Sequence, residues 1–188
     1  MLRTEMEGLA MGPIIATTRQ PYAALGGESA QAETSAGNRV RVWAAPSTAP
    51  LTSRYFCHGE ALRTFQLYGY TIFSGPDLDT VLADEYFPVA RTAVQREDIL
   101  AWMGPPNSGE WISTLAAAHA HPGFHPFVRC HTARVIVATI REGEIDENHT
   151  LVRTKNGVHA APGDASLRSV VGVYGAGYSV YRWRKKVD

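Results

Sequence analysis

Apolar residues recur at helical spacing in the middle of the chain, and this spacing predicts three helices. Residues 57–68 form the first, which Gly69 would end, and residues 77–85 form the second, with Asp77 as its cap. A short third helix is predicted over residues 110–120. The apolar positions that define the first two helices are Ala61, Leu62, Phe65, Leu78, Val81 and Leu82.

Short apolar or alternating runs predict strands, most of them late in the chain. Residues 39–43 alternate between polar and apolar, residues 96–102 step from polar to apolar, and residues 70–73 and 85–89 have extended character. Further strands are predicted over residues 130–140, 150–154, 170–174 and 178–183, separated by glycine-containing turns. The order indicates an α+β domain, with N-terminal helices packed on an antiparallel sheet.

The first 38 residues show no sustained period. They are rich in Ala, Gly, Thr and Ser, so we expect residues 1–38 to form a mobile or loosely docked arm. Residues 39–188 are expected to form one domain. A chain of 188 residues that is 45% hydrophobic is long and apolar enough for one core.

Charge and cysteine content narrow the class of protein. Lys plus Arg and Asp plus Glu number 18 each, so no net charge attracts the chain to nucleic acid or to a membrane. The basic residues at 182–186 are interpreted as a solvated end, and we expect neither an export signal nor a membrane span. Two cysteines, Cys57 and Cys130, make no disulfide framework, which favours reduced thiols in a cytoplasmic protein.

Cys57 is the main candidate for chemistry because it stands where a turn-rich segment gives way to a predicted helix. The N–H groups and the dipole at a helix start favour a thiolate. His131 opens a predicted strand further along the chain and could act as the general base. Cys130, its neighbour, would point to the opposite face and into the core.

A third polar residue usually orients the imidazole of such a pair. It should lie on or just after the neighbouring strand, where Thr154, Lys155, Asn156 and His159 are candidates. Asn156 is preferred because its amide can accept a hydrogen bond without adding charge. Asp98 is expected to hold a turn.

Several segments together resemble the NlpC/P60-like branch of the papain-fold superfamily, which includes CHAP and related amidase domains. The sequence YFCHG at 55–59 resembles the helix that carries the nucleophile, EDILAW at 97–102 resembles the strand that follows, and HTARVIV at 131–137 resembles the histidine strand. RTKNG at 153–157 and the segment from 173 to 182 resemble distant members. The similarity runs from about residue 55 to residue 184.

The resemblance implies hydrolysis or acyl transfer at an amide or thioester through an acyl-enzyme on Cys57, without a cofactor or metal. The substrate would be a peptide, an isopeptide or a carrier-bound acyl group. Two departures concern the cleft: Glu97 stands where glycine is usual, and residues 103–129 form a long loop rich in Pro, Gly and His. We expect substrate contacts from four residues: Tyr55, His58 (at the rim of the cleft, pointing away from Cys57), Trp102 and Trp111.

Two other interpretations remain at this point. A papain-like fold with an unreactive thiol would be a non-enzymatic binding module. Alternatively, His119, His121, His125, Cys130 and His131 could bind zinc, although their spacing matches no standard zinc site.

Overall fold

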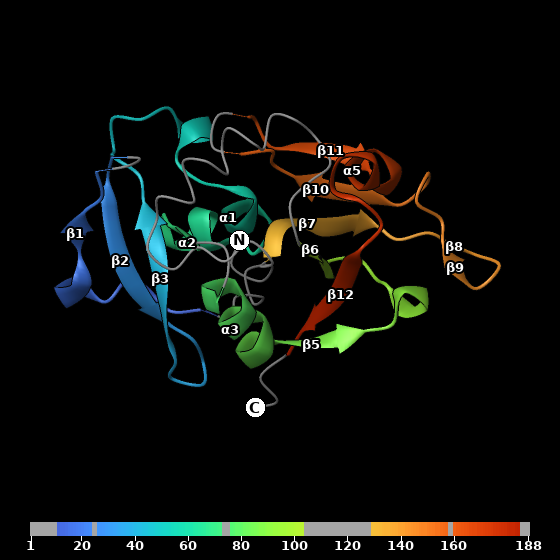
Figure 1. Ribbon diagram of the computed structural model, residues 1–188, viewed down its shortest axis with the longest axis horizontal. Helices are drawn as coiled ribbons and strands as arrows, with labels where there is room; N and C mark the ends of the chain where they lie inside the picture. The colour runs from blue at the N-terminus through green and yellow to red at the C-terminus, as the bar shows by residue number, and fades with distance from the viewer. Residues whose placement is uncertain (1–10, 24–25, 73–75, 104–128, 158–159, 185–188) are drawn as a thin grey trace, which may run out of the picture.

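The computed structural model describes residues 11–23, 26–72, 76–103, 129–157 and 160–184, and it is a layered α+β structure. Figure 1 shows a small sheet at one side, helices α1, α2 and α3 beside it, and a larger sheet beyond them. Helix α5 lies against the larger sheet. The predicted class, helices combined with antiparallel sheets, is confirmed.

The small sheet contains residues that were expected to be a loose arm. Its order is β1-β2-β3-β4, and β2 pairs with β3 in antiparallel register along its whole length. Ala30 and Ala32 of β2 are buried, so the prediction of an arm over residues 1–38 is wrong for the described part of that segment. Single-sequence periodicity missed β2 because its inward positions are small alanines. The elements are η1 Ala16–Thr18, β1 Gln20–Pro21, β2 Glu28–Glu33, β3 Arg39–Ala44 and β4 Thr71–Ile72.

The larger sheet is antiparallel throughout, with the order β11-β10-β7-β6-β12-β5. A short hairpin of β8 and β9 projects from it, and its turn has positive φ at Glu142 and Gly143. The strands are β5 Tyr86–Val89, β6 Ile99–Met103, β7 Arg129–Val137, β8 Ile140–Arg141, β9 Glu144–Ile145, β10 Leu151–Thr154, β11 Gly163–Ser166 and β12 Tyr178–Trp183.

The first predicted helix is split in two. α1 (Cys57–Ala61) and α2 (Thr64–Tyr68) are separated by Arg63, whose φ of 57° is left-handed, and α2 ends at Gly69 as predicted. α3 (Pro76–Glu85) matches the second predicted helix. The short 3-10 turns η2 (Leu51–Ser53) and η3 (Arg91–Ala93) complete the connections.

The segment predicted as a strand over residues 170–174 is helical instead. It belongs to α5 (Leu167–Tyr174). Ser166 caps the start of this helix, and its hydroxyl accepts a hydrogen bond from the backbone N–H of Ser169. Leu167, Val170 and Tyr174 lie at helical spacing and are buried. A short apolar run fits a strand or a helix equally well, and packing on the sheet decided between them.

Two apolar cores hold the layers together. The first lies between the small sheet and the larger sheet and includes side chains of α1 and α3. The second lies between α5 and the opposite face of the larger sheet. Alternation along β6 divides its side chains between them: Ile99 and Ala101 enter the first, and Leu100 and Trp102 the second.

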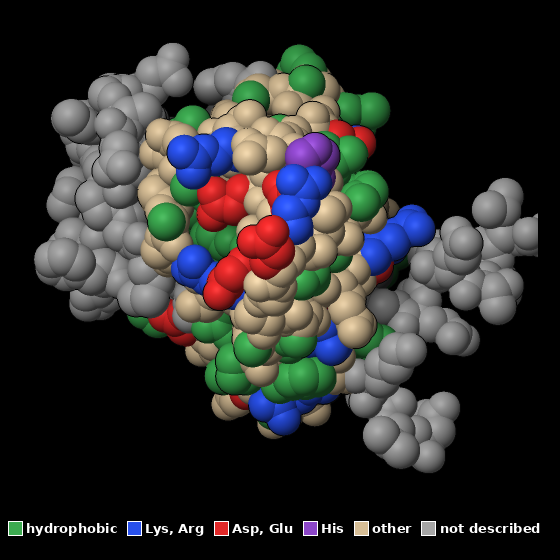
Figure 2. Space-filling model, turned by 90° about the vertical axis from the view of Figure 1, so that its right-hand side faces the viewer, with side chains coloured by type: hydrophobic (Ala, Val, Ile, Leu, Met, Phe, Trp, Pro, Cys, Tyr) green, Lys and Arg blue, Asp and Glu red, His purple; other side chains and the backbone are tan. Residues whose placement is uncertain are grey.

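Surface charge is mixed on the face that carries the β8–β9 hairpin. Figure 2 shows acidic and basic side chains interspersed there. Within the described ranges, no helix is long and apolar enough to cross a membrane.

Candidate functional site

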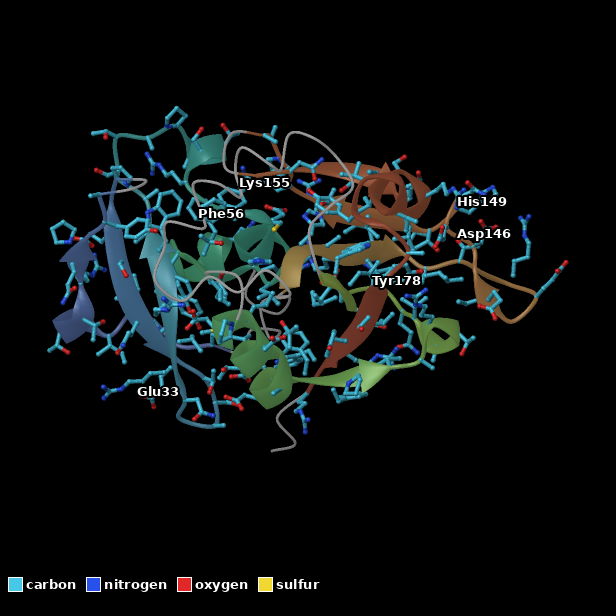
Figure 3. All side chains as sticks on the ribbon, in the orientation of Figure 1. Glu33, Phe56, Asp146, His149, Lys155 and Tyr178 are labelled. Atoms are coloured by element: carbon cyan, nitrogen blue, oxygen red, sulfur yellow. The ribbon has the colours of Figure 1, made fainter. Side chains whose placement is uncertain are left out.

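Cys57 is the first residue of α1, as predicted, and α1 packs against β7. Phe56 before it is extended, so the chain turns into the helix at the thiol. Figure 3 labels Phe56 and Lys155, which are distant in the sequence but both lie near the start of α1. Cys57 is only 7% exposed, so its sulfur is in a largely water-free environment.

His58 lies beside the sulfur rather than at a cleft rim. Its Nδ1 is 3.6 Å from Cys57 Sγ and 2.9 Å from the hydroxyl oxygen of Thr132 on β7. The side chain is buried, so the expectation that it points away from Cys57 toward the surface is wrong. α1 packs against β7, and the buried Thr132 hydroxyl takes the hydrogen bond of the His58 imidazole.

The ionisation of the site is governed by burial. Burial raises the pKa of the Cys57 thiol, while hydrogen bonds from Thr132 and His58 and the charge of Lys155 act in the opposite direction. Burial also lowers the pKa of His58 to about 4. At neutral pH the resting pair is therefore a thiol beside a neutral imidazole.

Lys155 is a buried cation next to this pair. It is completely inaccessible to solvent, its ammonium donates to the carbonyl oxygen of Gly157 at 2.7 Å, and it lies 5.0 Å from the ring centre of Tyr55. Burial lowers its pKa to about 8, against the attraction of Cys57 and Glu60. A lysine so placed favours negative charge on the sulfur.

His131 is held in one orientation by β10 and α5. Its Nε2 is 2.8 Å from the hydroxyl oxygen of Thr154, and its ring stacks on Tyr174 with a centroid distance of 3.8 Å. Burial lowers its pKa well below the usual value, and the proximity of His58 acts in the same direction. Thr154 thus occupies the orienting position for which the sequence favoured Asn156.

Asn156 lies one step further from the imidazole. Its side chain oxygen accepts a hydrogen bond from the Tyr174 hydroxyl at 3.3 Å, and Tyr174 stacks on His131. Asn156 itself is exposed, because it follows the end of β10. Its connection to His131 therefore runs through the Tyr174 ring.

Cys57 and His131 are not joined directly. Adjacent strand residues point to opposite faces, so Thr132 faces α1 while His131 faces Trp102 and Tyr174 on the other side of the sheet. No hydrogen bond between Cys57 and His131 occurs in the described part of the chain. The backbone of Thr132 nevertheless hydrogen-bonds the thiol, so the sulfur lies at the beginning of β7.

The aromatic residues expected to contact substrate are core residues in this structure. Tyr55 is buried and stacks on Phe65, and burial raises its pKa to about 12. Trp102 is completely buried, and its indole N–H donates to the Gly175 carbonyl oxygen at 2.8 Å. The sequence placed Tyr55 near Cys57 and Trp102 near His131, but it did not show that both aromatic side chains are buried.

Other predicted features fall where the structure makes no statement. These are Trp111, the helix over residues 110–120, His119, His121, His125 and His159, together with the side chain of Cys130, and all lie outside the described residues. Among the residues that are described, no three His, Cys, Asp or Glu side chains are grouped so that they could hold a metal ion.

Asp98 holds a turn, as predicted. Its carboxylate accepts from the backbone N–H of Gln95 at 2.8 Å and from the Arg182 guanidinium at 2.9 Å. Glu97 before it has a φ of 73°, which is the left-handed conformation that glycine adopts most readily. Glu97 therefore adopts the backbone conformation that a glycine would adopt at this position.

Thr132 and Tyr174 are the contacts that sequence reasoning missed. Thr132 is two residues before Arg134 on the same face of β7, and this alternation could have placed it against α1. Tyr174 could be found only after α5 was recognised as a helix, since its contact with His131 depends on how α5 crosses the sheet.

A scan against protein-family models and searches of curated proteins and of solved structures found no match to this chain.

Proposed function

We propose that this chain is a papain-like, NlpC/P60-like cysteine hydrolase or acyltransferase in which Cys57 attacks an amide or thioester carbonyl. The observation that supports this proposal best is the set of groups around the Cys57 sulfur. A thiol at the first position of a helix lies against His58 and the start of β7, beside the buried cation of Lys155. Substrates would be peptides, isopeptides or carrier-bound acyl groups.

In this mechanism the thiol proton passes to His131 as the sulfur bonds to the carbonyl carbon. Thr154 holds Nε2 of His131, and Nδ1 has no hydrogen-bond partner among the described residues, so Nδ1 is the atom that would take the proton. The imidazolium then gives this proton to the departing amine or thiol. Water or a second acceptor, deprotonated by the same imidazole, releases the acyl group from Cys57.

Two groups would stabilise negative charge in this sequence of steps. The backbone N–H of Cys57, at the start of α1, would donate to the carbonyl oxygen as it becomes an oxyanion. The ammonium of Lys155 would stabilise the thiolate before the attack.

His58 would position the thiol in the resting state. Its Nδ1 is already bonded to Thr132, which is closer to it than the sulfur is. Because His131 faces the other side of the sheet from Cys57, transfer to it requires β7 to move relative to α1 when substrate binds.

The test is acylation of the full-length chain by p-nitrophenyl acetate, followed by intact and peptide mass spectrometry. We expect one acetyl group on Cys57 and none there in Cys57→Ser at matched times. His131→Ala should slow acylation by about 100-fold or more, and His58→Ala by much less.

His149→Ala is the matched control, because His149 is an exposed histidine far along the chain from the site. Its acylation rate should equal that of the unmodified protein. Acylation of Cys57 that is equally fast in His131→Ala would exclude His131 as the base, and acylation elsewhere only would exclude the nucleophile.

The burial of Cys57 favours a second candidate, a papain-fold module that binds a partner without catalysis. A thiol that is 7% exposed and has a raised pKa reacts slowly. This candidate predicts slow iodoacetamide labelling of Cys57 from pH 5 to 9, and labelling unaffected by His131→Ala.

A further inference from the structure

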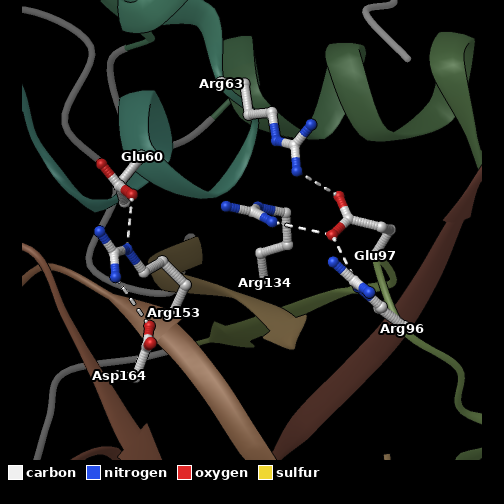
Figure 4. A network of polar contacts seen from close by, with 7 residues as sticks. All are labelled: Glu60, Arg63, Arg96, Glu97, Arg134, Arg153 and Asp164. Atoms are coloured by element: carbon white, nitrogen blue, oxygen red, sulfur yellow. Dashed lines mark hydrogen bonds and ion pairs between the residues drawn. The ribbon is translucent and has the colours of Figure 1, made fainter. Parts of the chain in front are cut away.

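A cavity of about 340 Å³ lies between the helices α1 and α2 and the strands β7, β10 and β11. Its size is in the range of small-molecule sites. Charged side chains dominate its walls, and Figure 4 shows them with the residues they bond to. The residues that carry the argument are Glu60, Arg63, Arg134, Arg153 and Asp164.

The acidic half of the cavity is already neutralised in part. Arg153 donates to Glu60 at 3.1 Å and to Asp164 at 2.9 Å, so one guanidinium lies between two carboxylates. Glu60 also accepts from the side chain amide of Gln66 at 2.9 Å. These contacts hold both carboxylates at one end of the cavity, which Figure 4 shows as a separate group.

The basic half has more cations than anions. Glu97 is bonded to Arg63 at 2.7 Å and to Arg134 at 2.9 Å, and Arg96 lies 3.7 Å from it. Three guanidinium groups therefore share one carboxylate. Only Arg63 and Arg134 of these line the cavity, so one positive charge is in excess there.

Arg134 is the cation with a buried donor that has no partner among the described residues. Glu97 takes a hydrogen bond from one terminal nitrogen, whereas Nε is buried and has no partner among the described residues. A guanidinium has five N–H donors, and its fork matches the oxygens of a phosphate or carboxylate. In Figure 4 the other end of this guanidinium points away from Glu97, toward the space between the two halves.

We infer that this cavity is an oxyanion site that takes a phosphate group at Arg63 and Arg134, in competition with the carboxylate of Glu97. The two guanidinium groups have more N–H donors than Glu97 can accept from, and a phosphate group offers more acceptor oxygens than a carboxylate. The acidic end, where Glu60 and Asp164 have acceptor oxygens, would receive hydrogen-bond donors from the rest of the ligand.

The site is separate from the thiol, and its assignment does not depend on the chemistry of Cys57. Thr132, which contacts the sulfur's neighbour His58, and Arg134 lie on the same face of β7. Two residues of a strand span about 7 Å. The cavity therefore lies further along β7, under the end of α1 opposite to Cys57.

The test is calorimetric titration of the full-length chain with inorganic phosphate at pH 7.5, at an ionic strength held constant with chloride. We expect saturable binding that is weakened about tenfold or more in Arg134→Gln and in Arg63→Gln. Acetate, a monoanion, should bind about tenfold more weakly than phosphate. Glu97→Gln removes the competing carboxylate and should strengthen phosphate binding by about threefold or more.

Arg168→Gln is the matched control, because Arg168 is an exposed arginine bonded to Glu147 on another surface, and its phosphate affinity should be unchanged. Circular dichroism and thermal melting of each variant identify loss of fold, which cannot produce the gain expected in Glu97→Gln. The assignment is overturned if phosphate gives no saturable binding, if acetate binds as tightly, or if folded Arg134→Gln keeps the original affinity.

Discussion

The residues around Cys57 show how a single position along a strand decides which side chains can react. Thr132 and His131 are neighbours in β7, yet one contacts His58 at α1 and the other stacks on Tyr174 of α5. The sulfur meets the backbone between them. The imidazole at the resting thiol is consequently that of His58.

Lys155 acts on the thiol through its charge. Replacing it with methionine removes a buried positive charge that lowers the pKa of Cys57, so we expect that pKa to rise. The thiolate fraction at pH 7.5, and with it the rate of iodoacetamide labelling, should fall about threefold to tenfold. The measurement is labelling from pH 5 to 9, followed by peptide mass spectrometry.

Lys155→Arg is the control for this change because it keeps the positive charge. Its labelling profile should lie closer to that of the unmodified protein than to that of Lys155→Met. An unchanged profile in Lys155→Met would show that the lysine has no electrostatic effect on Cys57.

At the scale of elements, α1 is placed by close contact of its backbone with its surroundings. Gly59 donates its backbone N–H to the Thr71 hydroxyl at 3.0 Å. A Cβ at this position would lie 2.9 Å from that hydroxyl oxygen and 3.2 Å from Cβ of Tyr55. Only glycine lets α1 approach β4 this closely, and that approach sets the position of Cys57 two residues before it.

Gly59 in α1 and Gly172 in α5 are expected to respond in opposite ways to alanine. Gly59→Ala should lower the free energy of unfolding by about 1–3 kcal/mol, since the contacts around it leave no room for a methyl group. Gly172→Ala in α5 should raise it by about 0.5–1 kcal/mol, because its Cβ would meet nothing within 4 Å and alanine favours the helix. Urea unfolding measures both.

A loss of stability in Gly172→Ala as large as that in Gly59→Ala would contradict this reasoning. Gly59→Ala should also alter the rate at which iodoacetamide labels Cys57, because it shifts α1, whereas Gly172→Ala should leave that rate unchanged.

At the scale of the whole molecule, the layered fold buries two imidazoles. His58 lies between α1 and the larger sheet, and His131 lies between that sheet and α5. Burial lowers the pKa of both side chains, to about 4 for His58. The folded protein therefore holds both in the neutral form under conditions where the unfolded chain binds protons.

This burial predicts loss of stability in weak acid. Between about pH 6.5 and 4 the unfolded state binds more protons, so the free energy of unfolding should fall as pH decreases through this range. Each histidine contributes at most about 1.4 kcal/mol per pH unit. The contribution is fully present above pH 6.5 and is lost toward the folded pKa. Urea unfolding at pH 7, 6 and 5 measures the slope.

The variants His58→Gln and His131→Gln should each flatten this pH dependence. His149→Gln, which changes an exposed histidine, should keep the original slope. Equal slopes in all four proteins would mean that neither buried imidazole is responsible.

Much of the secondary structure follows from local pattern. α3 and β3 lie close to their predicted ranges, and α2 ends at Gly69, because regular periods and a left-handed glycine act within a few residues. β2 was missed because its buried side chains are alanines. The residues 170–174 were taken for a strand because so short a run shows no distinct period.

The sequence by itself determined that Cys57 begins a helix, that His131 stands in a strand and that the chain is α+β. The tertiary structure decided which imidazole meets the sulfur, that Thr154 holds His131, and that three arginines share Glu97 beside a cavity. The physical reason is the distance along the chain over which each kind of interaction acts. Period and capping act between residues a few positions apart, whereas these contacts join segments that are distant in sequence and come together only when the layers pack.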